Sequence, residues 1–290
     1  MINGFITINK PSGITSNKVL GIVKHYLREI GITDKLGHMG TLDPIATGVL
    51  PIAIGRATRL FDYSLDKIKI YEAEFLFGAF SESLDADTEI TKMNFTMPEN
   101  AEIEVAIESI LGTYGQIPPQ YSAKSVDGVR AYKLARRGEY VELKPKTITV
   151  YSCDVISIKG NTAKMKISCS GGTYIRAIGR DIAEKLGTKA VMTKLNRIQS
   201  GTFSIDESIT LSDIENDPSC LSKKIIGMEK FLKDFPRIEI DPAEKKTILD
   251  GKKIKIDVKQ DVFYVVNCEG VLCGIGYAGE DSFKMKTWLL

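Results

Sequence analysis

A single charged residue stands in a segment that is otherwise small, apolar or turn-forming. Residues 37–55 read GHMGTLDPIATGVLPIAIG, and Asp43 is the only charged residue among them. A carboxylate beside an apolar run is costly to bury unless something holds its charge. An Asp-Pro pair is most often a turn in which Asp accepts from local backbone N–H groups. Here glycines allow close approach of a ligand or another chain segment. The small and polar neighbours of Asp43 are Gly37, His38, Gly40, Thr41 and Gly48.

An ionised carboxylate in a dry cleft needs a counter-charge, or its pKa rises. A helix is expected over about 174–186, ended by Gly187, and at 100° per residue its apolar residues share one face. Arg176 and Arg180 lie away from that stripe, on a common side. Arg176 taken alone is typical of a surface or phosphate-binding arginine. The apolar stripe consists of Ile175, Ile178, Ile182 and Leu186.

The formal net charge is only +2, but it is unevenly distributed. Residues 66–110 hold eleven acidic and three basic residues, whereas 159–200 hold nine basic and two acidic ones. Residues 124–146 are also basic, with seven bases and three acids. Clustered Lys and Arg displace the counterions of a polyanion, so these segments suggest a nucleic-acid-binding surface. Charge alone does not decide between that surface and a solvated helix face.

The 290 residues are enough for one large domain, or a large domain with a small one. The N-terminus lacks a basic stretch followed by an apolar run, and no apolar run approaches the ~20 residues that cross a bilayer. We therefore expect a soluble, cytoplasmic protein. Five scattered cysteines read as thiols, and with only two histidines a structural zinc site is not expected.

The sequence also argues against a nucleotide cofactor. GIGYAG at 274–279 matches a dinucleotide fingerprint in letters, but the eleven residues after it cannot supply the helix and the acid that such a site needs. There is no phosphate-binding G-x-x-x-x-G-K-[ST] motif. We expect no metal, nucleotide or redox cofactor.

The local patterns predict a mixture of strands and helices. The opening residues alternate and then turn at Pro11-Ser12-Gly13, after which Ser16 is the expected N-cap of a helix. Residues 71–77 and 163–169 alternate as half-buried strands do. Other elements are expected at 49–54 (a short buried element), 98–112 (a helix opened by Pro98) and 129–137 (a short basic helix). A composition shift places a domain boundary near 233, followed by three strand-like runs with glycine turns, which indicate a small β-rich module.

Six segments, in order along the chain, resemble the tRNA pseudouridine synthase B family, whose members isomerise the T-loop uridine at position 55. The match to the segment around Asp43 is the most specific, and together the matches cover nearly the whole chain. The segments are NKPSGITS (9–16), GHMGTLDPIATGVLPIAIGRATRL (37–60), KIYEAEFLFG (69–78), QIPPQYSAKSVDGVRAYKLARRG (116–138), CSGGTYIRAIGRDIAEKLG (169–187) and LNRIQSGTF (195–203).

The resemblance implies a fold and a domain division. The fold would be a mixed α/β (α+β) catalytic domain around a mainly antiparallel sheet, over residues 1–232. This domain would include an RNA-binding segment at about 116–150. The tail, 233–290, would be a small β-rich RNA-binding domain of the PUA type. The partner would be the T-arm of tRNA, bound without a cofactor by a protein that we expect to be a monomer.

The resemblance also implies roles for individual residues. Asp43 would be the catalytic carboxylate, acting as nucleophile or base. Arg176 would be its counter-charge, since an arginine partner can lower the pKa of a carboxyl group by about 1–3 units. Tyr71 would stack on the target uracil, with a hydroxyl available for proton transfer. The remaining expected substrate contacts are His38, which helps to place the flipped nucleotide, Leu195 as an apolar wall, Lys10 of the Lys-Pro motif, and Lys124, Arg130, Arg136 and Arg137 on the RNA backbone.

Two departures from the family pattern stand out. SESLDADT at 81–88 keeps Asp85 but has Thr88 where the family has glycine, so the turn there is expected to differ. Ser125 stands where a second lysine is common. Neither change is expected to touch the catalytic set.

Three alternatives remain open. A guide-RNA-dependent pseudouridine synthase of the archaeal and eukaryotic branch shares the Asp motif. A glycosidase would use Asp85 and Asp87 as a carboxylate pair, for which about 5–9.5 Å of separation is required. A non-catalytic RNA-binding or RNA-folding protein would share the basic segments without needing Asp43.

Overall fold

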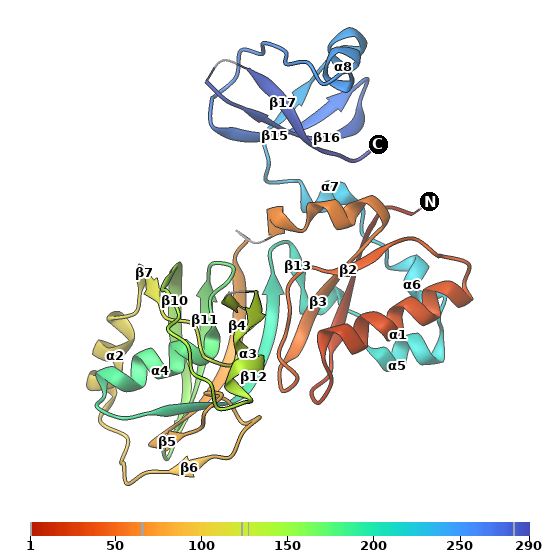
Figure 1. The fold of residues 1–290 in the computed structure, drawn as a ribbon. Helices are drawn as coiled ribbons and strands as arrows, with labels where there is room; N and C mark the ends of the chain where they lie inside the picture. The colour runs from red at the N-terminus through yellow and green to blue at the C-terminus, as the bar shows by residue number, and fades with distance from the viewer. Residues whose placement is uncertain (1, 65–66, 123, 127, 281) are drawn as a thin grey trace.

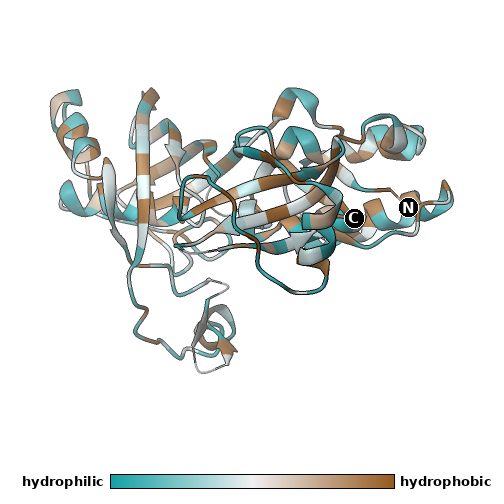
Figure 2. Cartoon of the chain, turned by 90° about the horizontal axis from the view of Figure 1, so that it is seen from above, coloured by the Kyte–Doolittle hydropathy of each residue, from teal (hydrophilic) through white to brown (hydrophobic). Residues whose placement is uncertain are grey.

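The computed structural model describes residues 2–64, 67–122, 124–126, 128–280 and 282–290. A long, twisted sheet runs across the larger part of the molecule, and a smaller sheet formed by the C-terminal residues lies at one end of it (Figure 1). Hydrophobic and hydrophilic residues alternate along the strands and helices of both parts (Figure 2). Within the described residues, no helix combines the length and the hydropathy needed to span a membrane.

The larger sheet has nine strands and is mainly antiparallel. This confirms the expected fold class. Along its main path the strands are β1 (Gly4–Lys10), β3 (Thr47–Ile54), β12 (Ala190–Ser200), β4 (Lys69–Phe77), β11 (Thr162–Cys169), β10 (Lys146–Lys159) and β7 (Gly112–Gln116). Two shorter strands join from the side, β2 (Leu36–His38) on β3 and β13 (Phe203–Ser204) on β12.

The two halves of this sheet meet at one short parallel contact. Strands β3 and β12 pair through only two residue pairs, Thr47 with Asn196 and Gly48 with Arg197. Gly48 has φ +99°, and a Cβ there would lie 2.3 Å from the Arg197 carbonyl oxygen, so only glycine permits this approach. The junction lies beside the segment that carries Asp43.

The half-buried strand expected at 71–77 is β4. Its side chains alternate between buried and partly exposed along the whole of Lys69–Phe77, as a period of two requires. One face therefore carries Tyr71, Ala73, Phe75 and Phe77 into the core. Helix α4 (Ile175–Lys185) packs on this face, where Gly179 lies so close to the Phe75 ring that an added Cβ would meet it at 2.4 Å.

Helix α1 (Ser16–Glu29) buries Val19, Val23 and Leu27 against the sheet, at the spacing read from the sequence. Its N-cap is Thr15, whose hydroxyl accepts from the Lys18 amide, so the prediction of Ser16 as the cap is wrong by one residue. The Ser16 hydroxyl instead bonds both the amide and the carbonyl of Leu42. The Ser16 hydroxyl thus makes a tertiary contact in place of the helix cap that the local sequence predicts.

The remaining elements of this part are short. The helix expected from Pro98 is α2 (Asn100–Glu108), and the basic helix expected at 129–137 is reduced to α3 (Ala131–Ala135), because Val129–Arg130 form strand β9. The others are η1 (Gly55–Leu60), η2 (Asp62–Ser64), β5 (Ala79–Phe80), β6 (Thr91–Lys92), β8 (Ser125–Val126), η3 (Ile205–Glu207), α5 (Leu211–Asn216), α6 (Cys220–Lys223) and α7 (Met228–Phe231).

The C-terminal residues form a four-stranded sheet, which confirms the expected β-rich module. The strand order is β14 (Arg237–Glu239), β15 (Val262–Cys268), β16 (Val271–Ala278) and β17 (Phe283–Trp288), with helix α8 (Pro242–Leu249) beside it. Strand β16 contains most of GIGYAG and is followed by strand β17 rather than by the helix that a dinucleotide-binding motif requires. Buried side chains of this sheet share one cluster with Phe5 and Phe203 of the larger part.

Candidate active site

Asp43 lies in the loop between β2 and β3, and this loop is fixed by contacts on both sides of the carboxylate. Ser16 holds Leu42 through two hydrogen bonds of 2.9 Å each. The amide of Gly13 donates to the Pro44 carbonyl oxygen, and the Ala46 amide to that of Asp43 itself. The Asp43 side chain remains 34% exposed, so it is held in place but open to a ligand.

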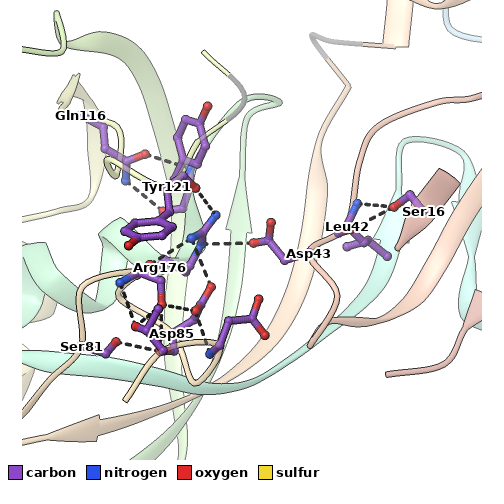
Figure 3. A network of polar contacts seen from close by, with 12 residues as sticks. Ser16, Leu42, Asp43, Ser81, Asp85, Gln116, Tyr121 and Arg176 are labelled. Atoms are coloured by element: carbon purple, nitrogen blue, oxygen red, sulfur yellow. Dashed lines mark hydrogen bonds and ion pairs between the residues drawn. The ribbon is translucent and has the colours of Figure 1, made fainter. Parts of the chain in front are cut away.

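Arg176 stands between two carboxylates that come from different segments of the chain (Figure 3). Its Nε lies 3.1 Å from Oδ2 of Asp43, and its Nη1 lies 3.1 Å from Oδ2 of Asp85. Nη1 also donates to the Ser83 carbonyl oxygen and Nη2 to that of Tyr121. The arginine side chain is 7% exposed. These contacts from different segments fix the orientation of the planar guanidinium group, and its Nε faces Asp43.

Asp85 is a site residue that the sequence reading did not include. Its side chain is 1% exposed, and its Oδ1 accepts from the Ser83 hydroxyl and from the Asp87 amide. Thr88, present where the family has glycine, places its Oγ1 2.8 Å from the Ser83 hydroxyl oxygen. That Thr88 leaves the catalytic set untouched stays a prediction; the turn that Thr88 helps to close holds Asp85, the second carboxylate partner of Arg176. The only available signal was that Asp85 is retained within an altered motif.

These contacts also remove the glycosidase alternative. A carboxylate pair for sugar hydrolysis needs two carboxyl groups open to the same substrate. Asp85 is buried and engaged by Arg176 and Ser83, and it presents no free carboxylate to a ligand.

The charge of Asp43 is set by opposing effects. Burial is the largest and raises the pKa of the carboxyl group above its usual range. The Arg176 guanidinium lowers the pKa, the Asp85 carboxylate raises it, and the Lys10 ammonium lowers it again. The pKa of Asp87 is also raised, first by burial and then by Asp85. Asp43 is therefore a carboxylate whose basicity is increased while a cation remains beside it.

Lys10 has a different position from the one expected of a substrate contact. It is fully buried, and its ammonium group donates to the carbonyl oxygens of Pro11, Pro44 and Ala46, at 2.8, 3.1 and 2.6 Å. Two of these acceptors, Pro44 and Ala46, closely follow Asp43 in the loop. Burial lowers the pKa of Lys10 to about 8, against the opposing effect of Asp43. The structure thus gives this lysine the task of holding the Asp43 loop.

Tyr71 and Leu195 are brought to the same place by strand pairing. In the β4–β12 register Tyr71 lies opposite Arg197, and Ala73 lies opposite Leu195. The two side chains are 6% and 7% exposed. Burial raises the pKa of the Tyr71 phenol, so its hydroxyl is protonated at neutral pH.

His38 ends strand β2, directly before the loop. Its Nδ1 is buried without a hydrogen-bond partner in the described part of the chain. Burial is the main reason that its pKa is lowered, and Arg197 adds to the effect. The ring is therefore neutral near pH 7.

The basic residues expected to meet RNA lie outside the buried site. Arg130, Arg136 and Arg137 are exposed, and Lys124 is partly exposed with its Nζ 3.4 Å from the Lys144 carbonyl oxygen. Their segment reaches the site through the Tyr121 carbonyl, which accepts from Arg176. The side chain of Ser125 lies outside the described residues.

A cavity of about 890 Å³ is lined by residues from both halves of the sheet, among them Lys10, Ile45 and Leu195. Asp43, Tyr71 and Arg176 are not part of its lining. The ion pairs Lys164–Glu72 and Lys194–Glu74 also line it. Across the described residues, no three His, Cys, Asp or Glu side chains come together as a metal site would require.

Comparison with known proteins agrees with this geometry. The family model for the TruB family pseudouridylate synthase N-terminal domain matches residues 28–175, and that for the tRNA pseudouridylate synthase B C-terminal domain matches residues 176–233. The chain belongs to the TruB family of pseudouridylate synthases. Its tRNA pseudouridine synthase B relative from Clostridium perfringens is 38% identical, with 100% of this chain and 99% of that protein covered.

More distant relatives extend the likeness within the TruB family. The tRNA pseudouridine synthase B of Pseudomonas fluorescens is 34% identical, over 97% of this chain and 93% of that protein. A chain in the crystal structure of a Cbf5–Nop10–Gar1 complex superposes with a TM-score of 0.75 at 25% identity, over 99% of this chain and 85% of that one. A chain of an H/ACA RNP bound to a substrate RNA gives 0.73 at 23% identity and shows the fold alone.

Proposed function

We propose that this protein converts the T-loop uridine of tRNA to pseudouridine, with Asp43 as the catalytic carboxylate. The observation that carries the proposal is the half-open Asp43 side chain, 3.1 Å from a buried arginine, in a member of the TruB family. The relatives that are 34–38% identical over nearly their whole length are tRNA pseudouridine synthases B.

The reaction is an isomerisation that consumes no redox equivalent. The N1–C1′ bond breaks, the uracil turns, and C5 forms the new bond to C1′. The hydrogen on C5 leaves as a proton and N1 gains one, so atoms and charge balance without a cofactor. One carboxylate as nucleophile or base, and one protonated phenol as a source or relay of a proton, are groups that this site holds.

The target uridine must leave its stack before it can reach Asp43. Flipping a base costs a few kcal/mol, which stacking and contacts in the pocket offset. In our proposal Tyr71 stacks on the uracil, Leu195 forms an apolar wall, and the neutral His38 helps to place the flipped nucleotide. Lys124, Arg130, Arg136 and Arg137 contact the RNA backbone, and Lys10 contributes by holding the loop.

The division of the chain follows from the same proposal. Residues 1–232 form the catalytic domain, with the RNA-binding segment at about 116–150, and residues 233–290 form the small RNA-binding domain. The protein acts as a monomer on the T-arm. We infer action without a guide, because the chain is 37–38% identical to proteins named tRNA pseudouridine synthase B but only 22–25% identical to chains of an archaeal box H/ACA sRNP Nop10–Cbf5 complex and a Cbf5–Nop10–Gar1 complex.

The direct test is to incubate the purified protein with an unmodified tRNA transcript and to map pseudouridine in the product. We expect one modified position, in the T-loop, with no guide RNA or other protein added. Modification that appears only when a guide RNA is present would move the assignment to the guide-dependent branch. Tight tRNA binding with no modification would leave a non-catalytic RNA-binding protein.

A further inference from the structure

Arg197 is the largest fully buried side chain of the described residues, and its role is not explained by the contacts of Asp43 and Arg176. It lies on strand β12 and is 1% exposed. No carboxylate of the described residues lies within ion-pair distance of its guanidinium group. Burying a charge with no opposite charge beside it is strongly unfavourable. Such a residue must provide something that an apolar side chain could not.

The contacts of the guanidinium group lie at the two ends of one loop. Its Nε donates to the Val49 carbonyl oxygen at 2.8 Å, and its Nη2 donates to the Gly40 carbonyl oxygen at 3.0 Å. Asp43 lies between these two points in the sequence. One rigid, planar side chain therefore fixes both ends of the segment that carries the carboxylate.

The same residue lies beside the neighbouring strand. The backbone of Arg197 pairs with Tyr71 in the β4–β12 register and with Gly48 across the β3–β12 junction. Burial is the largest effect and raises the pKa of the Tyr71 phenol, whereas the positive charge of Arg197 and a side-chain hydrogen bond from it lower that pKa. Arg197 is thus shared by the loop of Asp43 and the strand of Tyr71.

Lys10 and Arg197 hold different parts of that loop. Lys10 binds the carbonyl oxygens of Pro44 and Ala46, next to the carboxylate, whereas Arg197 binds the ends. Only Arg197 also connects the loop to β4. Without Arg197, the distance between Asp43 and Tyr71 would no longer be fixed. Lys10 cannot fix this distance, because it holds only the loop.

We infer that Arg197 is a positioning residue for the isomerisation, which ties the ends of the Asp43 loop to the Tyr71 strand so that both groups meet the flipped uracil in a fixed arrangement. The inference rests on the proposed function. It predicts that Arg197 affects the chemical step more than tRNA binding, because the side chain is buried away from the surface.

The experiment compares the full-length protein with Arg197→Gln and Arg197→Lys, and with Phe203→Leu as a stability control. Phe203 is a buried residue of β13 that packs on Phe5 and Phe231 and makes no hydrogen bond with the described residues of the Asp43 loop. The single-turnover rate is followed by tritium release from a tRNA transcript labelled at uracil C5, since that hydrogen leaves in the reaction. Filter binding gives the Kd for the same transcript, and circular dichroism gives the Tm.

We expect Arg197→Gln to lower the single-turnover rate constant about 100-fold, the size of effect that a misplaced reacting group produces. The Kd should change less than about threefold, because phosphate contacts are untouched. Arg197→Lys keeps the charge but loses the planar guanidinium group, so its rate constant should be about tenfold higher than that of Arg197→Gln and about tenfold lower than that of the wild type. Phe203→Leu should lower the Tm while its rate constant stays within about twofold of wild type.

Two results would overturn the inference while leaving the proposed function intact. One is a wild-type single-turnover rate constant for Arg197→Gln, measured when this variant and Phe203→Leu have a similar Tm. The other is a rate loss accounted for by a weaker Kd. If Arg197→Gln does not fold, Arg197→Lys decides, with tenfold slowing in support and an unchanged rate against. Wild-type protein that releases no tritium would remove the proposed function, and this inference with it.

Discussion

The Asp43 site and the contact between the two sheets are both buried, but the site is built from charged side chains and the contact from apolar ones. The site contains three buried cations, Lys10, Arg176 and Arg197, and a carboxylate that is 1% exposed, Asp85. The sheet-to-sheet contact is a cluster of apolar side chains. Its members include Phe5, Phe203, Phe231, Leu232, Val265, Ile275 and Leu289.

The difference shows what each region is for. Apolar contact is favourable and non-directional, so it stabilises the joint between the sheets without fixing single atoms. Buried charges gain little net stability, but they hold atoms in defined directions. At the edge of the joint Arg56 and Arg59 only donate to the carbonyl oxygens of Leu289 and Trp288. The comparison predicts that changes in the site reduce catalysis, and that changes in the joint reduce stability.

The largest effect is expected for Arg176→Gln. This change leaves Asp85 buried without its cation and removes the counter-charge of Asp43, so the single-turnover rate should fall by about 10³-fold, of the order seen for a lost charge-stabilising group. Breaking a buried pair also costs about 3–5 kcal/mol of stability. Tritium release and urea unfolding measure the two effects. A folded Arg176→Gln protein with near-normal rate would break the comparison.

The second prediction concerns pH. Because burial raises the pKa of Asp43 and the reaction needs the ionised form, activity should be lost as the pH falls through that raised pKa. Arg176 opposes the rise, so the acid limb of the pH–rate profile should move to higher pH in Arg176→Lys if the shorter cation is less well placed. Rates at fixed ionic strength, measured from neutral to acid pH, test this. A profile without an acid limb would contradict it.

Several of these features could be read from the sequence, because they depend on local pattern. The alternation at 71–77 gave the strand of Tyr71, and the helical period placed Arg176 off the apolar stripe of α4. Asp85 could not be found this way, since its contact with Arg176 depends on how distant segments meet. The same is true of Arg197, which counted in the sequence only as one base of a basic segment.

A local reading also failed where a tertiary contact competed with it. Ser16 has a typical N-cap residue type, yet its hydroxyl holds Leu42 and the preceding threonine caps the helix. Lys10 was expected to contact the substrate as part of the Lys-Pro motif, but three carbonyl oxygens surround its ammonium group. In both residues the polar group was recognised and its partner was not.

A smaller effect is expected for Lys10→Met. The change leaves the carbonyl oxygens of Pro44 and Ala46 without their donor, at about 1–3 kcal/mol for a buried group. We expect a rate loss of about tenfold, a factor worth ~1.4 kcal/mol of the barrier, and a Tm lower by several degrees. The matched control is Lys18→Met, an exposed lysine of α1 that should behave as wild type. A Lys10→Met protein with normal rate and Tm would separate this lysine from the site.

The smallest effect on rate is expected in the joint. Phe231→Ala removes a ring that stacks on Phe5, and a deletion of this size costs about 3–5 kcal/mol. The single-turnover rate of the folded protein should nevertheless stay within about twofold of wild type, since no group of the site is touched. Urea unfolding and tritium release on one preparation give both values. A rate loss as large as that of Lys10→Met would show that the joint also positions the site.

The most direct test of the account is Asp43→Asn, which keeps the size of the side chain and removes its charge. Pseudouridine formation on an unmodified tRNA transcript and the Kd for that transcript should be measured on the same preparation. The account predicts no detectable pseudouridine, even with enzyme in excess, and a Kd within about threefold of wild type because the phosphate contacts remain. Pseudouridine formed by Asp43→Asn at a rate near that of the wild type would contradict it.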